Sequence, residues 1–234
     1  MTQLFFITGM GRSGSMFLAN LLNKCEGGKV LHEPVIKREQ IEHLKAFKNE
    51  EASLNYISHF RKKIILDNAK GLEFYGEVNS YLRNHVPALK KVFPEAKLLH
   101  LVRDGRDVVR SICCRNTFKE NDKTTIGVEP EGGWKKESRF EKICWYWVES
   151  NDRVSKHIDK CINLEKIISD WDYFKTNILD YLGLKMSRKL WEDLKAVRIN
   201  KNKTNYDKWT EDQKNIFNVM CEKTMEKFGY YNGC

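Results

Sequence analysis

An apolar run, a glycine-rich turn and an amphipathic stretch open this chain, and together they constrain its fold more than any other feature. Residues 4–8 are typical of a short buried strand, and apolar side chains recur at helical spacing in residues 16–24. The turn between them reads Gly9-Met-Gly-Arg-Ser-Gly-Ser15. Such a unit leaves unpaired backbone N–H groups at the start of the helix, where the helix dipole also favours an anion. We therefore expect a phosphate-binding loop.

The loop departs from the nucleotide-binding motif GxxxxGK followed by Ser or Thr. Gly9 and Gly14 fit the two glycines of that motif. Ser15 replaces the lysine that reaches the phosphates, and Met16 replaces the hydroxyl residue that holds Mg²⁺. Arg12 supplies a cation from inside the loop instead. The sequence therefore disfavours an ordinary Mg²⁺-dependent ATPase or kinase mechanism.

The same loop fits the dinucleotide-binding pattern GxGxxG through Gly9, Gly11 and Gly14. That pattern is weakly specific by itself, and Arg12 and Ser13 would crowd a dinucleotide pyrophosphate. A plain glycine turn between a strand and a helix, with no ligand, is the remaining alternative.

The rest of the chain alternates short apolar segments with segments of helical spacing. We expect further strands at residues 30–31, 74–78, 97–102 and 162–164. We expect helices within residues 36–70 and at residues 81–93, 106–115, 141–158, 171–182 and 210–228. This alternation indicates a central parallel sheet flanked by helices on both faces. No linker or internal repeat interrupts the chain, so we expect one α/β domain over residues 1–234.

The net charge of the chain bears on which ligands and binding partners to expect. Lys and Arg number 41 and Asp and Glu 32, which gives a net charge of +9. A solvated lysine-rich surface accounts for such a charge, and so does a polyanionic partner. The chain has no long basic block with interleaved aromatic residues, so we expect a small, multiply phosphorylated ligand and no nucleic acid. No apolar run approaches the roughly 20 residues that a membrane span needs, so we expect none.

Cysteine and histidine usage indicates a reducing compartment and no metal. The seven cysteines form no CxxC pair, and Cys113 and Cys114 are adjacent, which is typical of reduced, buried thiols. Residues 4–8 have no basic region before them and no cleavage-like site after them, so we expect no signal peptide and a cytoplasmic location. The six histidines lack metal-ligand spacing.

A second motif follows the predicted strand at residues 97–102. Arg103 comes directly after that strand, and Ser111 lies within the next predicted helix. A cation at a strand end and a hydroxyl in the following helix can converge on one phosphate, for which Arg offers a bidentate fork. One alternative is a salt bridge from Arg103 to Asp104 or Asp107. Another places Asp104 on Mg²⁺, against which the missing loop hydroxyl argues.

Both motifs resemble elements of the PAPS-dependent sulfotransferases, where PAPS is 3′-phosphoadenosine 5′-phosphosulfate. Residues 11–18 (GRSGSMFL) resemble the loop that binds the 5′-phosphosulfate, and residues 98–111 resemble the element that binds the 3′-phosphate. The resemblance implies a P-loop-like α/β fold in which a loop cation neutralises the transferring sulfuryl group without a metal. It implies that the donor is bound by Gly11, Arg12, Ser13, Gly14, Ser15, Met16, Arg103, Ser111 and Lys203.

The resemblance weakens toward the C-terminus. Lys203 and Thr204, ahead of Trp209, are similar to a late basic segment that touches the 3′-phosphate in this family. Asn202 stands where the cytosolic members often have Arg. Residues 209–230 look like the closing helix of the family.

The segment His32-Glu33-Pro34 follows the predicted strand at residues 30–31. Ligands bind at the carboxyl edge of a parallel sheet, and sulfuryl transfer to a hydroxyl needs a base for its proton. A Glu in this region is the base of carbohydrate sulfotransferases, which His-Glu-Pro resembles. We therefore predict Glu33 as the base and His32 as the second candidate. The alternative for Glu33 is a loop cap or a pair with a lysine.

Other members place a Lys and a catalytic His where this chain has Glu77-Val-Asn-Ser80. Arg12 and the loop N–H groups must then stabilise more of the charge in the transition state, with Asn79 or Ser80 as further donors. Residues 116–140 form a long polar stretch of the kind that makes specificity loops. Trp134 within it either stacks on an acceptor or packs back on the body.

The resemblance implies an enzyme that moves a sulfuryl group from PAPS to a hydroxyl acceptor, such as a carbohydrate, a lipid or another small molecule. Adenosine 3′,5′-bisphosphate is the expected second product. One alternative is a Mg²⁺-dependent nucleotide or small-molecule kinase with an atypical loop. The other is a non-catalytic protein that binds an anionic ligand or nucleic acid through its positive charge.

Overall fold

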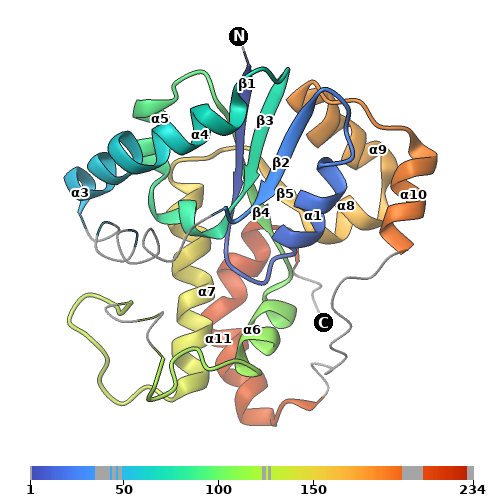
Figure 1. The fold of residues 1–234 in the computed structure, drawn as a ribbon. Helices are drawn as coiled ribbons and strands as arrows, with labels where there is room; N and C mark the ends of the chain where they lie inside the picture. Colours follow the sequence, from blue (N-terminus) through green and yellow to red (C-terminus); the bar gives the residue numbers. More distant parts are fainter. Residues whose placement is uncertain are drawn as a thin grey trace.

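Five parallel strands form the centre of the fold, in the order β2-β3-β1-β4-β5 (Figure 1). They are β1 (Gln3–Thr8), β2 (Gly28–His32), β3 (Phe74–Val78), β4 (Lys97–Val102) and β5 (Cys161–Asn163). The computed structural model describes residues 2–34, 43, 46, 49–122, 125, 128–196 and 208–230. The parallel sheet expected from the sequence is therefore confirmed.

Alternate side chains of the central strands enter separate cores on the two faces of the sheet. In β1, Phe5 and Ile7 join one core, and Phe6 joins the other. In β3, Phe74 packs with Phe5, while Tyr75 packs with Phe6. A strand that is buried on both faces has no need for polar residues at alternate positions, which is why β1 reads as a continuous apolar run.

Helices cover both faces, and Figure 1 shows the two groups on opposite sides of the sheet. The Phe5 face carries α1 (Ser15–Leu22), α8 (Leu164–Ser169), α9 (Trp171–Phe174), the π-helical segment η3 (Lys175–Asp180) and α10 (Arg188–Ala196). The Phe6 face carries α3 (Glu50–Asn55), the π-helical segment η1 (Tyr56–Arg61), α4 (Lys62–Ala69) and α5 (Val86–Val92).

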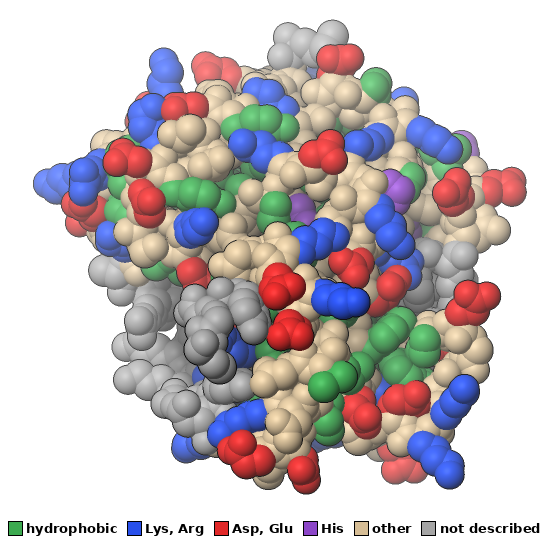
Figure 2. Space-filling model, turned by 180° about the vertical axis from the view of Figure 1, so that it is seen from behind, with side chains coloured by type: hydrophobic (Ala, Val, Ile, Leu, Met, Phe, Trp, Pro, Cys, Tyr) green, Lys and Arg blue, Asp and Glu red, His purple; other side chains and the backbone are tan. Residues whose placement is uncertain are grey.

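A third group of helices packs around Trp147 and Phe217, toward the carboxyl ends of the strands (Figure 1). It consists of α6 (Gly105–Cys113), α7 (Arg139–Ser155) and α11 (Glu211–Lys227). None of the described helices is long and apolar enough to cross a membrane. Basic and acidic side chains are interspersed on the face seen in Figure 2, so the basic residues form no continuous patch among the residues described there.

Two helical predictions differ from the structure. The helix expected at residues 81–93 is divided into a 3₁₀ segment, η2 (Ser80–Asn84), and α5. The Asn79 side chain accepts a hydrogen bond from the Tyr81 N–H and so starts η2, while Pro87 requires a place in a first turn because it lacks an N–H. Helices α8 and α10 were not expected; α8 spans only six residues, which is too short for a helical period to show in the sequence.

A fully buried ion pair joins η1 to β3. Arg61 Nη2 lies 2.5 Å from Glu77 Oε1, and both side chains have no exposed surface. Tyr75 Oη and Asn79 Nδ2 also donate hydrogen bonds to the Glu77 carboxylate, at 2.9 and 3.0 Å. Arg61 Nη1 donates to the Pro34 carbonyl at 3.0 Å. The pair therefore ties the segment that follows β2 to the interior of the sheet.

We expect Arg61→Met to lower the free energy of unfolding by about 3–5 kcal/mol, because it leaves the Glu77 carboxylate buried without its cation. The double variant Arg61→Met with Glu77→Gln removes that charge and keeps an acceptor for Tyr75 and Asn79. Urea denaturation followed by circular dichroism should therefore find the double variant more stable than the single one. A double variant as unstable as Arg61→Met would contradict this account.

Candidate functional site

The loop between β1 and α1 packs closely on two neighbouring elements. A Cβ atom at Gly9 would lie 2.1 Å from the Leu101 carbonyl oxygen of β4. Gly14 caps α1 with a φ of +88°, and a Cβ atom there would lie 2.6 Å from the Leu164 side chain of α8. Both positions require glycine, the first for space and the second also for its left-handed backbone. The loop that the sequence predicted is therefore held against β4.

Arg12 brings the two sequence motifs together. Its Nε donates a hydrogen bond to Ser111 Oγ at 3.0 Å, and its carbonyl accepts one from Arg103 Nη1 at 3.2 Å. The φ of Arg12 is +77°, a conformation that costs a non-glycine residue about 1–3 kcal/mol. Residues of this kind concentrate at ligand sites, where the surrounding structure holds the strained conformation.

Cations gather around the loop. Burial lowers the pKa of Arg12, and the charges of Arg115 and Arg103 lower it further, while Glu33 raises it. Arg103 also pairs with Asp107 at 2.6 Å, as the salt-bridge alternative proposed. Arg103 Nε also lies 3.9 Å from Glu165 Oε1. The charges of Arg12 and Arg115 repel each other, so an anion that enters between them would relieve that repulsion.

The residues at the end of the glycine loop and the start of α1 could bind an oxyanion. Ser13 is buried, and its Oγ has no hydrogen-bond partner among the described residues. A buried hydroxyl without a partner is costly, and a phosphate or sulfate oxygen would supply the missing acceptor. Ser15 Oγ is hydrogen-bonded to His32 Nε2 at 2.9 Å. The Met16 side chain is 44% exposed, so only the backbone N–H of Met16, in the first turn of α1, is available to an anion at the loop.

Glu33 stands where β2 leaves the sheet, with a φ of +42°. Ser80 Oγ donates a short hydrogen bond to Glu33 Oε1, and the Ser80 N–H lies 3.4 Å from the same oxygen. His32 Nε2 lies 3.9 Å from that oxygen. The Glu33 N–H donates to the Val78 carbonyl at 3.2 Å, which continues the β2–β3 pairing. The sequence suggested Ser80 as a donor to the charge of the transition state, whereas in the structure its hydroxyl donates to the Glu33 carboxylate.

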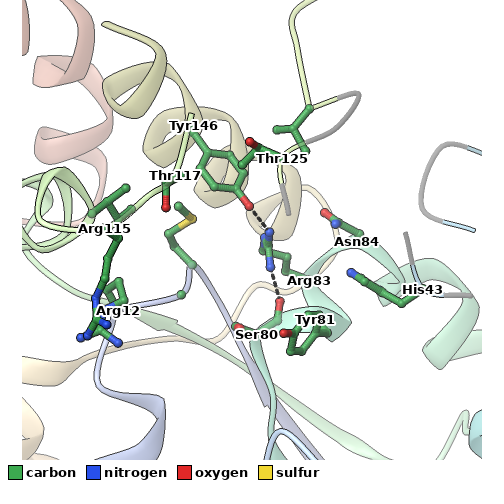
Figure 3. Close-up of a pocket in the computed structure, with 14 residues that line it drawn as sticks. Arg12, His43, Ser80, Tyr81, Arg83, Asn84, Arg115, Thr117, Thr125 and Tyr146 are labelled. Carbon is green, nitrogen blue, oxygen red and sulfur yellow. Dashed lines mark hydrogen bonds between the residues drawn. The ribbon is translucent and has the colours of Figure 1, made fainter. Parts of the chain in front are cut away.

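A cavity of about 320 Å³ opens next to the glycine loop (Figure 3). Gly11 and Arg12 border it on one side, and Ser80 borders it on another. Arg83 of η2 and Tyr146 of α7 also line it. The cavity is large enough for a small molecule, and its wall combines aromatic rings with charged groups.

Several pocket residues were not predicted as site residues. In α7, Ile143 and Trp147 belong to the buried stripe, and Tyr146 between them lines the cavity. Arg83 and Arg115 belong to no recognised sequence motif. Only their positions, shortly after β3 and just after α6, could have indicated them. Trp134 packs edge-on against Phe118 and Trp145, so it follows the alternative of packing on the body.

Two further predictions concern the late basic segment and a Mg²⁺ ligand at Asp104. Lys203 and Thr204 lie outside the described residues. Asp104 caps α6 through the Arg106 N–H and pairs with the Arg106 side chain. Within the described part of the chain, no group of three or more His, Cys, Asp or Glu side chains is placed to hold a metal ion.

Beside the cavity, two buried histidines form a hydrogen-bonded chain. His43 Nδ1 lies 2.7 Å from His85 Nε2, and His85 Nδ1 lies 2.7 Å from Ser53 Oγ. Burial lowers the pKa of His43 to about 3, with a further contribution from the charge of Arg83. Burial also lowers the pKa of His85 well below its usual value. Both rings are therefore neutral in the folded protein at neutral pH.

Comparison with known proteins identifies a family for this chain. The sequence profile described as "Sulfotransferase family" matches residues 28–188. No protein with a curated description matches the sequence.

Three solved structures resemble the fold. A sulfotransferase from Alicyclobacillus acidocaldarius has a TM-score of 0.57 and 14% identity, and the match covers 99% of this chain and 97% of that one. The sulfotransferase domain from the curacin biosynthetic pathway has a TM-score of 0.54 and 14% identity, covering 81% and 77%. Mouse sulfotransferase SULT7A1, complexed with PAP, has a TM-score of 0.54 and 12% identity, covering 98% and 89%. At such identities the structural likeness concerns the fold alone.

We expect the free energy of unfolding to fall as the pH drops below about 6.5, the pKa of histidine in an unfolded chain. His43 and His85 bind protons there only after unfolding, so each adds about 1.4 kcal/mol per pH unit to the loss. Urea denaturation at several pH values between 7 and 5 measures this slope. His85→Gln should reduce it, whereas the exposed His59→Gln should leave it unchanged. An identical slope in both variants would contradict the assignment.

Proposed function

The chain belongs to the sulfotransferase family, and on this premise we propose that it transfers a sulfuryl group from PAPS to a hydroxyl acceptor. The observation that carries the proposal is the contact of Arg12 with both Arg103 and Ser111. These residues belong to two motifs that are far apart in the sequence, and each motif alone would suit one of the two anionic ends of PAPS. Their meeting supports a single site that binds both ends.

The donor side of the proposal assigns a role to each predicted residue. PAPS supplies the activated sulfuryl group, and the chain supplies the charges and donors around it. Arg12 and the backbone of residues 11–16 face the 5′-phosphosulfate. The Ser13 hydroxyl supports this assignment, because it is buried and has no hydrogen-bond partner in the part of the chain that the structure describes. Arg103 and Ser111 hold the 3′-phosphate. Lys203 is proposed to join them from outside the described residues.

Glu33 is the proposed base. Ser80 binds one carboxylate oxygen, Oε1, and so fixes the direction in which the other oxygen points. Glu33 takes the proton of the acceptor hydroxyl while the new O–S bond forms and the S–O bond to the 5′-phosphate breaks. The products are a sulfate ester, adenosine 3′,5′-bisphosphate and a protonated Glu33. His32, hydrogen-bonded to Ser15, is the second candidate for this role.

The charge that develops on the leaving oxygen needs stabilisation without a metal. Arg12 and the N–H groups at the start of α1 are fixed by the packing of Gly9 and Gly14, so they need little reorganisation during the reaction. Nothing in the described residues or in the matched family supports the kinase alternative. The cytoplasmic location stays a prediction from the cysteine usage.

Thermal unfolding with adenosine 3′,5′-bisphosphate tests the donor site. At about 100 times its dissociation constant, the bisphosphate should add roughly 2.7 kcal/mol to the free energy of unfolding. Arg103→Ala should abolish the effect. Arg188→Ala, an exposed arginine of α10 that pairs with Glu192, is the matched control and should retain it. Stabilisation by ATP with Mg²⁺, and none by the bisphosphate, would favour the kinase alternative.

Substitutions at the reacting groups test the mechanism. We expect Arg12→Ala and Glu33→Gln each to lower turnover of PAPS at least about a hundredfold, measured across sugar, phenol and alkyl alcohol acceptors. Glu33→Gln should leave the affinity for the bisphosphate intact, because Glu33 acts on the acceptor. The exposed Glu192→Gln serves as the control. Full turnover by Glu33→Gln would transfer the role to His32, which His32→Gln then tests.

A further inference from the structure

Positively charged side chains border the cavity. Three arginines border it, namely Arg12, Arg83 and Arg115, and none of its described lining residues is Asp or Glu. Figure 3 shows Arg12 and Arg115 together on the side of the glycine loop, with Arg83 apart from them and close to Ser80 and Tyr146. Arg12 and Arg115 therefore accompany the donor, and Arg83 is the cation that faces the rest of the cavity.

Arg83 is held rigidly by neutral groups. Its Nη1 donates to the Ser80 carbonyl at 2.6 Å, and its Nη2 donates a short hydrogen bond to Tyr146 Oη. The guanidinium carbon lies 5.5 Å from the centroid of the Tyr146 ring. No described carboxylate forms an ion pair with Arg83, although its side chain is half-buried. A desolvated cation without a counter-ion is costly, and a bound anion would offset that cost.

Ser80 sets the spatial relation between Arg83 and Glu33. Its side chain binds the Glu33 carboxylate, and its carbonyl binds Arg83. Burial raises the pKa of Tyr81, the next residue; the charge of Glu33 raises it further and the charge of Arg83 lowers it, so both charges act on this side chain. A ligand whose hydroxyl meets Glu33 therefore has Arg83 within reach of a neighbouring substituent.

We propose that the hydroxyl acceptor carries an anionic group, a carboxylate or a phosphate, and that Arg83 binds this group and determines the specificity for it. The inference rests on the proposed function, since it assumes that Glu33 receives the acceptor hydroxyl. The planar fork of Arg83 suits either oxyanion, and its Nε is buried without a hydrogen-bond partner among the described residues.

Calorimetric titration of the bisphosphate-loaded protein tests the proposal with two matched pairs of hydroxylated probes. One pair is para-hydroxybenzoate with para-hydroxybenzamide, and the other is glycerol phosphate with glycerol. The bound bisphosphate keeps the anionic probes out of the donor site. We expect at least one anionic probe to bind about tenfold or more tightly than its neutral partner. A difference within the benzoate pair indicates an acceptor with a carboxylate, and a difference within the glycerol pair indicates an acceptor with a phosphate.

Two variants separate a specificity role from a structural one. Arg83→Gln should bring the ratio of the two affinities close to one by weakening only the anionic probe. Arg83→Lys should retain part of the ratio, because it keeps the charge without the fork. Arg188→Gln, an exposed surface arginine, should retain all of it. The bisphosphate affinity and the melting temperature of each variant report whether the donor site and the fold are intact.

The outcomes distinguish this proposal from the proposed function. If the wild type binds the bisphosphate but binds charged and neutral probes equally, or binds none of the four, the anionic acceptor is wrong and the donor assignment stands. Equal weakening of both members of a pair by Arg83→Gln would make Arg83 a structural residue and also overturn the proposal. If the wild type does not bind the bisphosphate, the proposed function fails and this inference fails with it.

Discussion

The approach of the glycine loop to the end of β4 is the contact on which the rest of the site depends. The backbone at Gly9 passes so close to the Leu101 carbonyl that no side chain fits between them. This proximity allows Arg103, at the end of β4, to donate to the Arg12 carbonyl, and it places Ser111 beside the Arg12 guanidinium. A larger residue at position 9 would separate the two motifs, and with them the two ends of the donor site.

A buried polar network supports the other half of the site. Glu77 lies inside the sheet, where its desolvation is costly, and it is stable there because its oxygens accept from Arg61, Tyr75 and Asn79. Arg61 also binds the carbonyl of the residue that follows Glu33. The network therefore holds the chain at the exit of β2, where the backbone adopts the left-handed conformation that directs Glu33 toward Ser80.

Arginine side chains give the walls of the cavity a positive charge. Arg12, Arg103 and Arg115 are close enough for their charges to affect one another, and Arg83 adds a cation on the far side. Glu33 is the negative charge that the Arg12 guanidinium senses. A carboxylate at Glu33 beside several cations suits a reaction in which an anionic donor enters, a proton is taken up and an anionic leaving group departs.

Local sequence determined the strand–loop–helix opening, the alternation of strands and helices, and the spacing of the second motif, because each depends on residues within one or two turns of one another. It also placed Arg12 in the glycine loop, and Glu33 and Arg103 just after strands, at the edge where parallel sheets bind ligands. Only the tertiary structure decided that Arg12 meets Ser111 and that Arg83 and Tyr146 enter the same cavity. These contacts depend on the strand order and on how the helices pack, neither of which local periodicity encodes.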